Sequence, residues 1–315
     1  MALDSVPFAL GPTYGAYLWS AILCTSFWAI TCVQVFIYFM RSSKDSKLIK
    51  YMILSVWALD TIHEAMIVGS VHVYLVTNFG DFQSFMTVIP TMLLEFLFQV
   101  IASTITQGFF VWRIFQLSTH YSLWSKVKSM RWLAFAIWVP FGCLQIGLCV
   151  LYIVKGLQSP TVLTLVSPFF YNQTIVYLVI ASAVDLALSL TITVILYQLR
   201  HSELSQYSST SSALKKLIII SINNGIWTAL FAILDLILYV AYPTTTLYLI
   251  FDFTMCSLYT NTLLANLNAR DYVASCLATE VMMSNNMPAS SSLEFPNPLE
   301  SSMRFDDRSK AKDRK

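Results

Sequence analysis

Long apolar segments recur along the chain, separated by short polar ones. Seven of these segments hold about 20 or more mostly apolar residues, enough to cross roughly 30 Å of hydrocarbon as an α-helix. They run approximately over residues 15–40, 49–76, 86–117, 130–154, 173–199, 214–241 and 245–268. The pattern predicts an all-α polytopic membrane protein, a bundle of seven transmembrane helices.

Composition supports a membrane protein and places its boundaries. Apolar residues make up 57% of the chain and charged residues 11%, whereas soluble domains are about one quarter charged. The first segment is expected to stay as an anchor, because residues 1–14 hold Asp4 and no basic residue and the apolar stretch is too long for a signal peptide. We predict one membrane domain over residues 1–270, a short amphipathic helix at 271–283 and a disordered cytoplasmic tail at 284–315.

The basic residues indicate how the bundle is oriented. Eighteen of the 19 Lys and Arg residues lie in the tail or in, or within about five residues of, the gaps after the first, third and fifth segments, and Lys155 is the exception. Because basic residues near span ends stay cytoplasmic, we expect the N-terminus outside and the C-terminus inside. The basic loops are predicted to meet anionic lipid or a cytoplasmic protein. No nucleic-acid partner is expected, and the plasma membrane is the default location.

Six acidic residues lie inside the predicted spans, where each would cost about 2.5–3.5 kcal/mol if it faced lipid. They are Asp60 and Glu64 in the second span, Glu95 in the third, Asp185 in the fifth, Asp235 in the sixth and Asp252 in the seventh. No Lys or Arg lies deep in a span beside them. We therefore expect these acids to face the interior of the bundle, together with His63 and Gln99, which share helix faces with them.

The depth of these acids suggests three interpretations. Four fall in the outer half of the bundle and two near its midplane: Glu64, Glu95, Asp235 and Asp252, then Asp60 and Asp185. The outer acids with Gln99 predict an outward-opening acidic cavity for a small polar, cationic or lipidic ligand, as in a receptor-like sensor. The midplane acids with His63 suit a proton or cation path, as in a proton-linked transporter of small solutes. A structural hydrogen-bond network without any ligand is the third interpretation.

Enzyme chemistry is not indicated by the sequence. A zinc hydrolase inside a helical bundle needs about three protein ligands, and only His63 and His72 lie in or near a span, on opposite helix faces. We therefore predict no catalytic residue, no cofactor and no metal site. The seventh segment has no lysine for retinal. The third ends in Val111-Trp-Arg-Ile114, without the acid-Arg-aromatic triplet usual in rhodopsin-like receptors.

Aromatic residues gather at both ends of the predicted spans. They are Tyr14, Tyr17, Trp19, Phe169, Phe170, Tyr171 and Tyr248 at the outer end, and Tyr38, Tyr51, Trp112, Trp124 and Trp132 at the inner end. We interpret them as the aromatic belt of a membrane interface and not as a ligand cage.

Two positions are candidates for covalent modification. Asn172-Gln-Thr174 is a glycosylation sequon in the predicted exterior loop 155–172, close to the membrane. Cys276 follows the last span and is a candidate for palmitoylation, the alternative being a plain juxtamembrane thiol. No exterior loop contains a cysteine, so no disulfide is expected.

Four stretches of the sequence carry a family resemblance. They are Gly11-Pro-Thr-Tyr-Gly15, then Gln34-Val-Phe-Ile-Tyr38 followed by Lys44 and Asp45, then Leu59-Asp-Thr-Ile-His63 with Asn78-Phe-Gly80, and finally Leu258 to Arg270. Over about residues 8–272 the chain resembles seven-span proteins of mushroom-forming fungi that carry a C-terminal membrane domain of unknown function. The resemblance implies a multi-pass membrane protein and assigns no functional residue.

Overall fold

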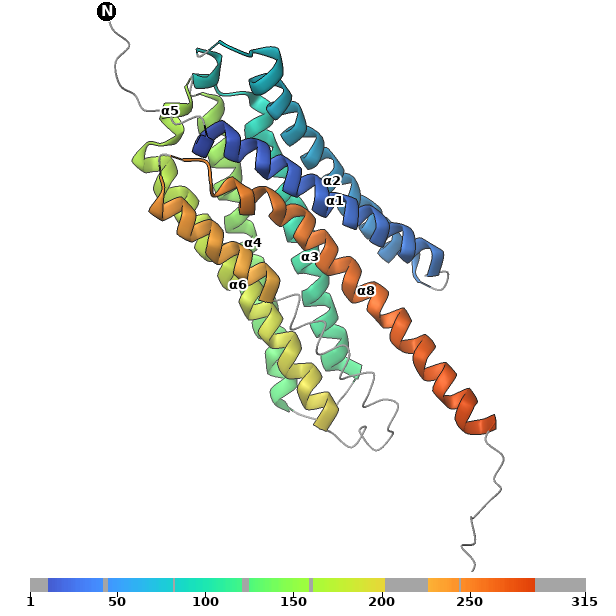
Figure 1. Cartoon of the computed structure of the whole chain (residues 1–315). Helices are drawn as coiled ribbons and strands as arrows, with labels where there is room; N and C mark the ends of the chain where they lie inside the picture. Colours follow the sequence, from blue (N-terminus) through green and yellow to red (C-terminus); the bar gives the residue numbers. More distant parts are fainter. Residues whose placement is uncertain are drawn as a thin grey trace, which may run out of the picture. The chain divides into compact units, whose positions relative to one another are not determined.

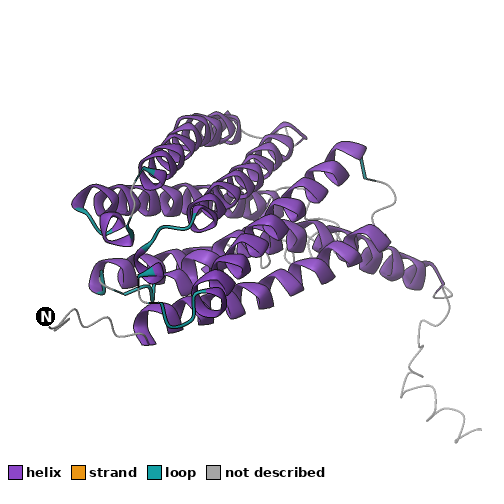
Figure 2. Cartoon of the chain, turned by 90° about the horizontal axis from the view of Figure 1, so that it is seen from above, coloured by secondary structure: helices purple, strands orange, loops and turns teal. Residues whose placement is uncertain are grey.

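The computed structural model describes residues 11–41, 45–81, 83–120, 125–158, 161–201, 226–243 and 245–286. Nearly all of these residues are helical, and no strand occurs within these ranges (Figure 2). The chain divides into two units, residues 1–275 and 276–315. The helical bundle and every site discussed below belong to the first unit.

Seven long helices account for most of the described residues (Figure 1). They are α1 (Ala16–Arg41), α2 (Lys47–His72), α3 (Pro90–His120), α4 (Ser125–Leu157), α6 (Pro168–His201), an unlabelled helix Ile226–Ala241, and α8 (Leu249–Asn286). Four short segments lie at their ends: η1 (Gly11–Gly15), η2 (Val73–Thr77), η3 (Ser84–Met86) and α5 (Val162–Leu165).

Five of these helices are long and apolar enough to cross a membrane, by length and composition. The segments are Pro12–Arg41, Lys47–Thr77, Pro90–Gln116, Ala134–Leu157 and Pro168–Gln198. Large apolar side chains on their outer faces, such as Trp19, Phe36, Met40 and Leu190, are more than half exposed. Exposing so many apolar side chains to water would cost free energy, whereas contact with lipid tails, which are equally apolar, would not.

Helix α8 lies at the centre of the bundle. Every residue from Phe253 to Leu264 is buried. Leu263 and Leu264 pack in one apolar cluster with residues of α1, α2 and α3, while Tyr259 packs with the Ile226–Ala241 helix. Polar contacts join α8 to α1 as well, because the Gln34 amide donates to Asn261 at 3.0 Å. Polar groups can occupy α8 because other helices surround it.

Several predicted ends differ from the structure by a few residues, and two of the differences change an interpretation. Helix α6 begins at Pro168 instead of residue 173, a position where proline fits because the first helical N–H has no partner within the helix. Asn172 is therefore an exposed residue of a helix and not of a loop. Helix α8 continues through 271–283 instead of ending near 268, since residues 249–286 contain no glycine or proline to stop it. The predicted tail beyond residue 286, the side chain of Cys276 and residues 214–225 lie outside the described residues.

A turn around Asn78–Gly80 lies between η2 and η3. Gly80 has a φ of 83°, in the left-handed region that glycine occupies without strain. Asp81 then accepts hydrogen bonds from the Ser84 hydroxyl at 2.7 Å and the Gln83 N–H at 3.0 Å. These bonds hold the pKa of the Asp81 carboxyl below its usual value, with the Ser84 hydroxyl as the larger cause.

Replacing Gly80 with alanine is expected to lower the free energy of unfolding by about 1–2 kcal/mol, because a Cβ is strained in the left-handed conformation. The cost is conformational, since an added Cβ would meet no atom within 4 Å. Gly69, in the helical part of α2, is the matched control with the same open space. Gly69→Ala should raise stability by up to about 1 kcal/mol. Unfolding by SDS in mixed micelles measures both, and equal effects at the two positions would contradict the role of Gly80.

Candidate ligand-binding site

A cavity of about 110 Å³ lies at the end of the bundle where α1 begins and where α5 is found; we call this end the α5 end. Seven tyrosines contribute to its lining: Tyr14, Tyr17, Tyr74, Tyr152, Tyr171, Tyr239 and Tyr248. Tyr171 and Tyr239 stack with ring centroids 5.4 Å apart, and Tyr248 meets Tyr239 edge-on at 4.9 Å. We call this space the tyrosine cavity.

The tyrosine cavity corrects the interpretation of the outer aromatics as a belt. Tyr14, Tyr17, Tyr171 and Tyr248 line the cavity, and Phe170 is buried. Trp19 and Phe169 are exposed as a belt requires, and so are Tyr51, Trp112 and Trp132 at the opposite end. Tyr38 is buried and donates to Asp45 at 2.8 Å; Trp124 is outside the described residues. Position at a helix end does not determine whether a ring faces lipid or the bundle axis.

A second cavity of about 50 Å³ adjoins the tyrosine cavity and shares Met92, Tyr152 and Tyr248 with it. Carboxylates from three helices line it: Glu95 of α3, Asp235 of the Ile226–Ala241 helix and Asp252 of α8. We call it the acidic cavity. Among the residues that line the two cavities there is no Lys or Arg.

Asp235 differs from the other two acids in its bonding. Its side chain is 1% exposed, and its Oδ1 has no hydrogen-bond partner. Asp252 accepts a hydrogen bond from the Gln99 amide at 3.2 Å. Because a buried polar atom without a partner is costly, the free oxygen of Asp235 is a natural contact point for a donor that enters the cavity.

Glu95 faces α2 as well as the acidic cavity. Its Oε2 lies 3.0 Å from Nε2 of His63, and the two side chains are 6% and 0% exposed. The sequence offered no lysine or arginine to pair with the buried acids, and the imidazole supplies the opposite charge when it is protonated. His63 thus belongs with Glu95, although the sequence analysis assigned these two residues to different functions.

The two acids of α2, Asp60 and Glu64, form hydrogen bonds to neighbouring helices. Asp60 accepts a hydrogen bond from the Ser257 hydroxyl of α8 at 2.7 Å. Glu64 accepts one from the Thr25 hydroxyl of α1. Glu64 does not line the acidic cavity. Gln99 does not line it either, but its amide donates to Asp252, which does. Of the five residues predicted to bind a ligand, the structure therefore brings three together around one space.

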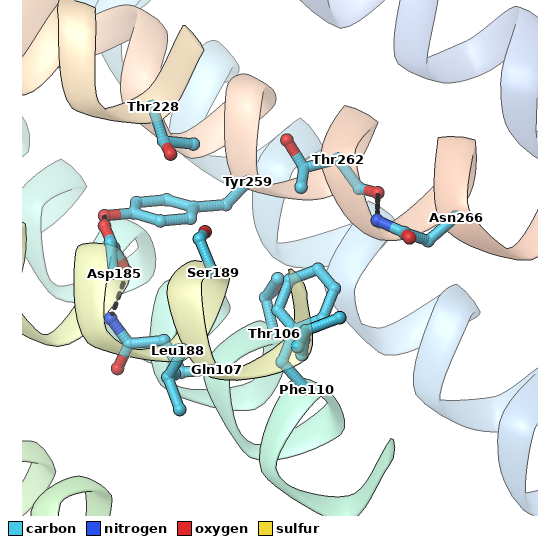
Figure 3. A pocket seen from close by; sticks show the side chains of 11 residues that line it. Thr106, Gln107, Phe110, Asp185, Leu188, Ser189, Thr228, Tyr259, Thr262 and Asn266 are labelled. Carbon is cyan, nitrogen blue, oxygen red and sulfur yellow. Dashed lines mark hydrogen bonds between the residues drawn. The ribbon is translucent and has the colours of Figure 1, made fainter. Parts of the chain in front are cut away.

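A third cavity, of about 30 Å³, surrounds Asp185 (Figure 3). The Tyr259 ring reaches across it so that its hydroxyl donates to one carboxylate oxygen, and the Gln107 amide donates to the other at 2.9 Å. Its polar lining and its size suit about one or two water molecules. It shares no lining residue with the other two cavities. Asp185 thus joins α3, α6 and α8 through hydrogen bonds.

Several residues of the site were missed in the sequence. Tyr74, Tyr152 and Tyr239 line the tyrosine cavity, yet each lies inside an apolar segment, where an aromatic residue is ordinary. A helical wheel would have placed Tyr239 four residues after Asp235, on the same face. No comparable signal exists for Tyr152, because its neighbours come from other parts of the chain.

The apolar outer faces, the polar interior and five helices of spanning length define an apolar, helical, multi-pass membrane protein. Residues 181–272 match a family of unknown function, DUF6534. The matched stretch includes Asp185, Asp235 and Asp252, and it agrees with the domain of unknown function that the resemblance implied. No curated protein and no solved structure matches the chain.

Proposed function

We propose that the protein is a receptor-like, non-enzymatic membrane protein that binds a small organic cation in the tyrosine and acidic cavities. The observation that carries the proposal is that the two cavities adjoin, with seven tyrosines lining one and three carboxylates lining the other. The faces of aromatic rings attract cations, and tyrosine cages recognise quaternary ammonium groups. Carboxylates favour the same charge and disfavour anions, so one ligand class satisfies both cavities.

The size of the site favours a compact ligand. The tyrosine cavity of about 110 Å³ and the acidic cavity of about 50 Å³ leave room for only a small ligand. Most of the residues that line them are aromatic or aliphatic. A ligand with a methylated or primary ammonium head would place its charge near Asp235, whose Oδ1 lacks a partner. A primary or secondary amine would also donate a hydrogen bond to it.

The proposal includes seven spans with the N-terminus outside, which makes the α5 end the outer end. The Ile226–Ala241 helix is apolar but shorter than the other five, and the proposal counts it as a span. Helix α8 is not among the helices apolar enough to span by composition, and polar residues within a membrane bundle are tolerated where they face its interior. The bias of basic residues supports this orientation and favours contact with anionic lipid or a cytoplasmic partner at the opposite end. Seven spans would also fit the resemblance to fungal seven-span proteins.

A proton-linked transporter is the second candidate, using Asp60, His63 and Asp185. The contact between His63 and Glu95 favours it, because adjacent titratable groups can exchange a proton. Two observations weigh against it. Both oxygens of Asp185 are already hydrogen-bonded, and its cavity shares no lining residue with the others. We therefore place binding before transport.

The test compares choline with its neutral carbon isostere, 3,3-dimethyl-1-butanol, on the detergent-purified chain. Binding to the folded state at about 100 times the dissociation constant should stabilise the protein by about 2.7 kcal/mol. We expect choline or tetramethylammonium to raise the unfolding temperature and the isostere to have little effect, because the two differ in charge and hardly in shape. Equal shifts from both compounds, or none from any cation in a panel of small amines, would overturn the proposal.

A further inference from the structure

We propose that Asp60, His63 and Cys256 form a zinc-binding site inside the bundle. One ligand atom from each residue lies within 4.8 Å of the other two. All three side chains are fully buried, Asp60 and His63 on α2 and Cys256 on α8. This site lies outside the lining of the three cavities, and the inference does not rest on the proposed cation binding.

Two of the three residues have buried atoms without a hydrogen-bond partner. Oδ1 of Asp60 accepts from Ser257, while its Oδ2 lacks a hydrogen bond of good geometry, and the Cys256 thiol and the Thr31 hydroxyl lie close to the carboxyl group. Nδ1 of His63 is also buried and unpartnered. Because native interiors leave few buried polar atoms without partners, two such atoms beside a cysteine sulfur point to a missing binding partner.

The contact with Glu95 suits a metal-binding histidine. Metal-ligating imidazoles almost always have a carboxylate or carbonyl at their other ring nitrogen, which fixes the ring and its tautomer. Here Oε2 of Glu95 lies 3.0 Å from Nε2 of His63. That arrangement leaves Nδ1 as the ring nitrogen available to a metal.

The donor set selects zinc among the common metals. Imidazole nitrogen, thiolate sulfur and carboxylate oxygen together suit Zn²⁺, whereas Mg²⁺ and Ca²⁺ prefer oxygen alone. Ligand atoms in a tetrahedral zinc site are roughly 3.5 Å apart, given bond lengths of about 2.0–2.3 Å. Small rotations of the three side chains from their present separation of at most 4.8 Å would reach that distance. Three protein ligands leave one position of the tetrahedron open.

Charge balance also favours a divalent ion at this depth. Thiolate and carboxylate each carry one negative charge, so Zn²⁺ with neutral His63 gives a site of zero net charge. A neutral cluster avoids most of the cost of burying Asp60 among apolar helices. The thiol of Cys256 would lose its proton on binding, as metal-bound cysteines do. The sequence predicted no metal site, since Cys256 is far from the α2 residues in the chain and resembles an ordinary buried cysteine.

The experiment measures metal by mass spectrometry in the full chain after purification in detergent and gel filtration. We expect about one zinc per chain, as in other three-ligand sites. His63→Ala and Cys256→Ser should retain under about a tenth of it. Cys149→Ser is the matched control, because Cys149 is equally buried but lies in an apolar cluster of α3, α4 and α6; this variant should keep its zinc.

A second measurement on the unaltered chain avoids the risk that a variant fails to fold. Protein stripped with a chelator is refilled with Co²⁺, and a near-ultraviolet sulfur-to-cobalt charge-transfer band should appear at one equivalent. Zinc without that band would mean that Cys256 is not a ligand and would overturn the site as proposed. The proposal also fails if the stripped chain binds neither zinc nor cobalt, or if Cys256→Ser and Cys149→Ser hold equal amounts of zinc.

Discussion

Replacing His63 with leucine is expected to lower the free energy of unfolding by about 1–3 kcal/mol, because it leaves the buried carboxyl group of Glu95 without its partner. Glu95 is 6% exposed at its side chain and lies 3.0 Å from the imidazole. Water cannot reach the carboxylate easily, and no Lys or Arg lines the adjoining acidic cavity. SDS titration in mixed micelles measures the loss. The protein is treated with a chelator first, so that a bound metal contributes nothing to the comparison.

The double variant His63→Leu/Glu95→Leu distinguishes the interaction between the two side chains from their packing against neighbouring residues. Replacing both partners of a buried polar contact by apolar side chains of similar shape can cost little, so the double variant should recover most of the lost stability. His72→Leu is the control for the loss of an imidazole, because His72 is exposed near the end of α2; its effect should stay within about 0.5 kcal/mol. Additive losses in the double variant would mean that the two side chains do not interact.

The helices could be predicted from the sequence because hydrophobic length is a local property. Five predicted segments correspond to helices of spanning length, with ends that shift by a few residues. The prediction that buried acids face inward also follows from a local rule, since lipid excludes charge. Asp60, Glu95 and Asp235 are indeed among the most buried side chains of the structure.

Contacts between helices could not be predicted in this way. A spacing of three or four residues shows that Asp60 and His63 share a face, but not that Ser257 and Cys256 of α8 lie opposite. Likewise Tyr17 and Trp19 are both aromatic residues at the start of the first span, but Tyr17 is buried and Trp19 is exposed. Which helix lies beside which depends on contacts between distant segments, and one sequence does not specify these contacts.

The candidate site draws on both halves of the chain. Asp235 and Asp252 fall inside the stretch that matches the family of unknown function, whereas Glu95 and Tyr17 lie before it. The matched segment alone would therefore lack one carboxylate and much of the tyrosine cavity. Binding studies accordingly need the full chain, and they can separate contributions from the two parts by changing one carboxylate in each.

Replacing Asp235 with asparagine is expected to weaken binding of small ammonium ligands by roughly 10–150-fold, since a hydrogen bond or contact to a charged group contributes about 1.5–3 kcal/mol. The change keeps the shape of the side chain and removes its charge. It should not destabilise the free protein, because Oδ1 of Asp235 has no hydrogen-bond partner to lose. Isothermal titration of the purified chain with choline or tetramethylammonium measures the affinity.

Asp185→Asn is the matched control for this variant. Asp185 is also a buried carboxylate, but it lies in the separate cavity with both oxygens bonded to Tyr259 and Gln107. A general loss of negative charge in the bundle would weaken binding in both variants, whereas direct contact predicts a loss only in Asp235→Asn. If affinity falls equally in the two, the cation is attracted by the field of the whole bundle, and the acidic cavity is not where it binds.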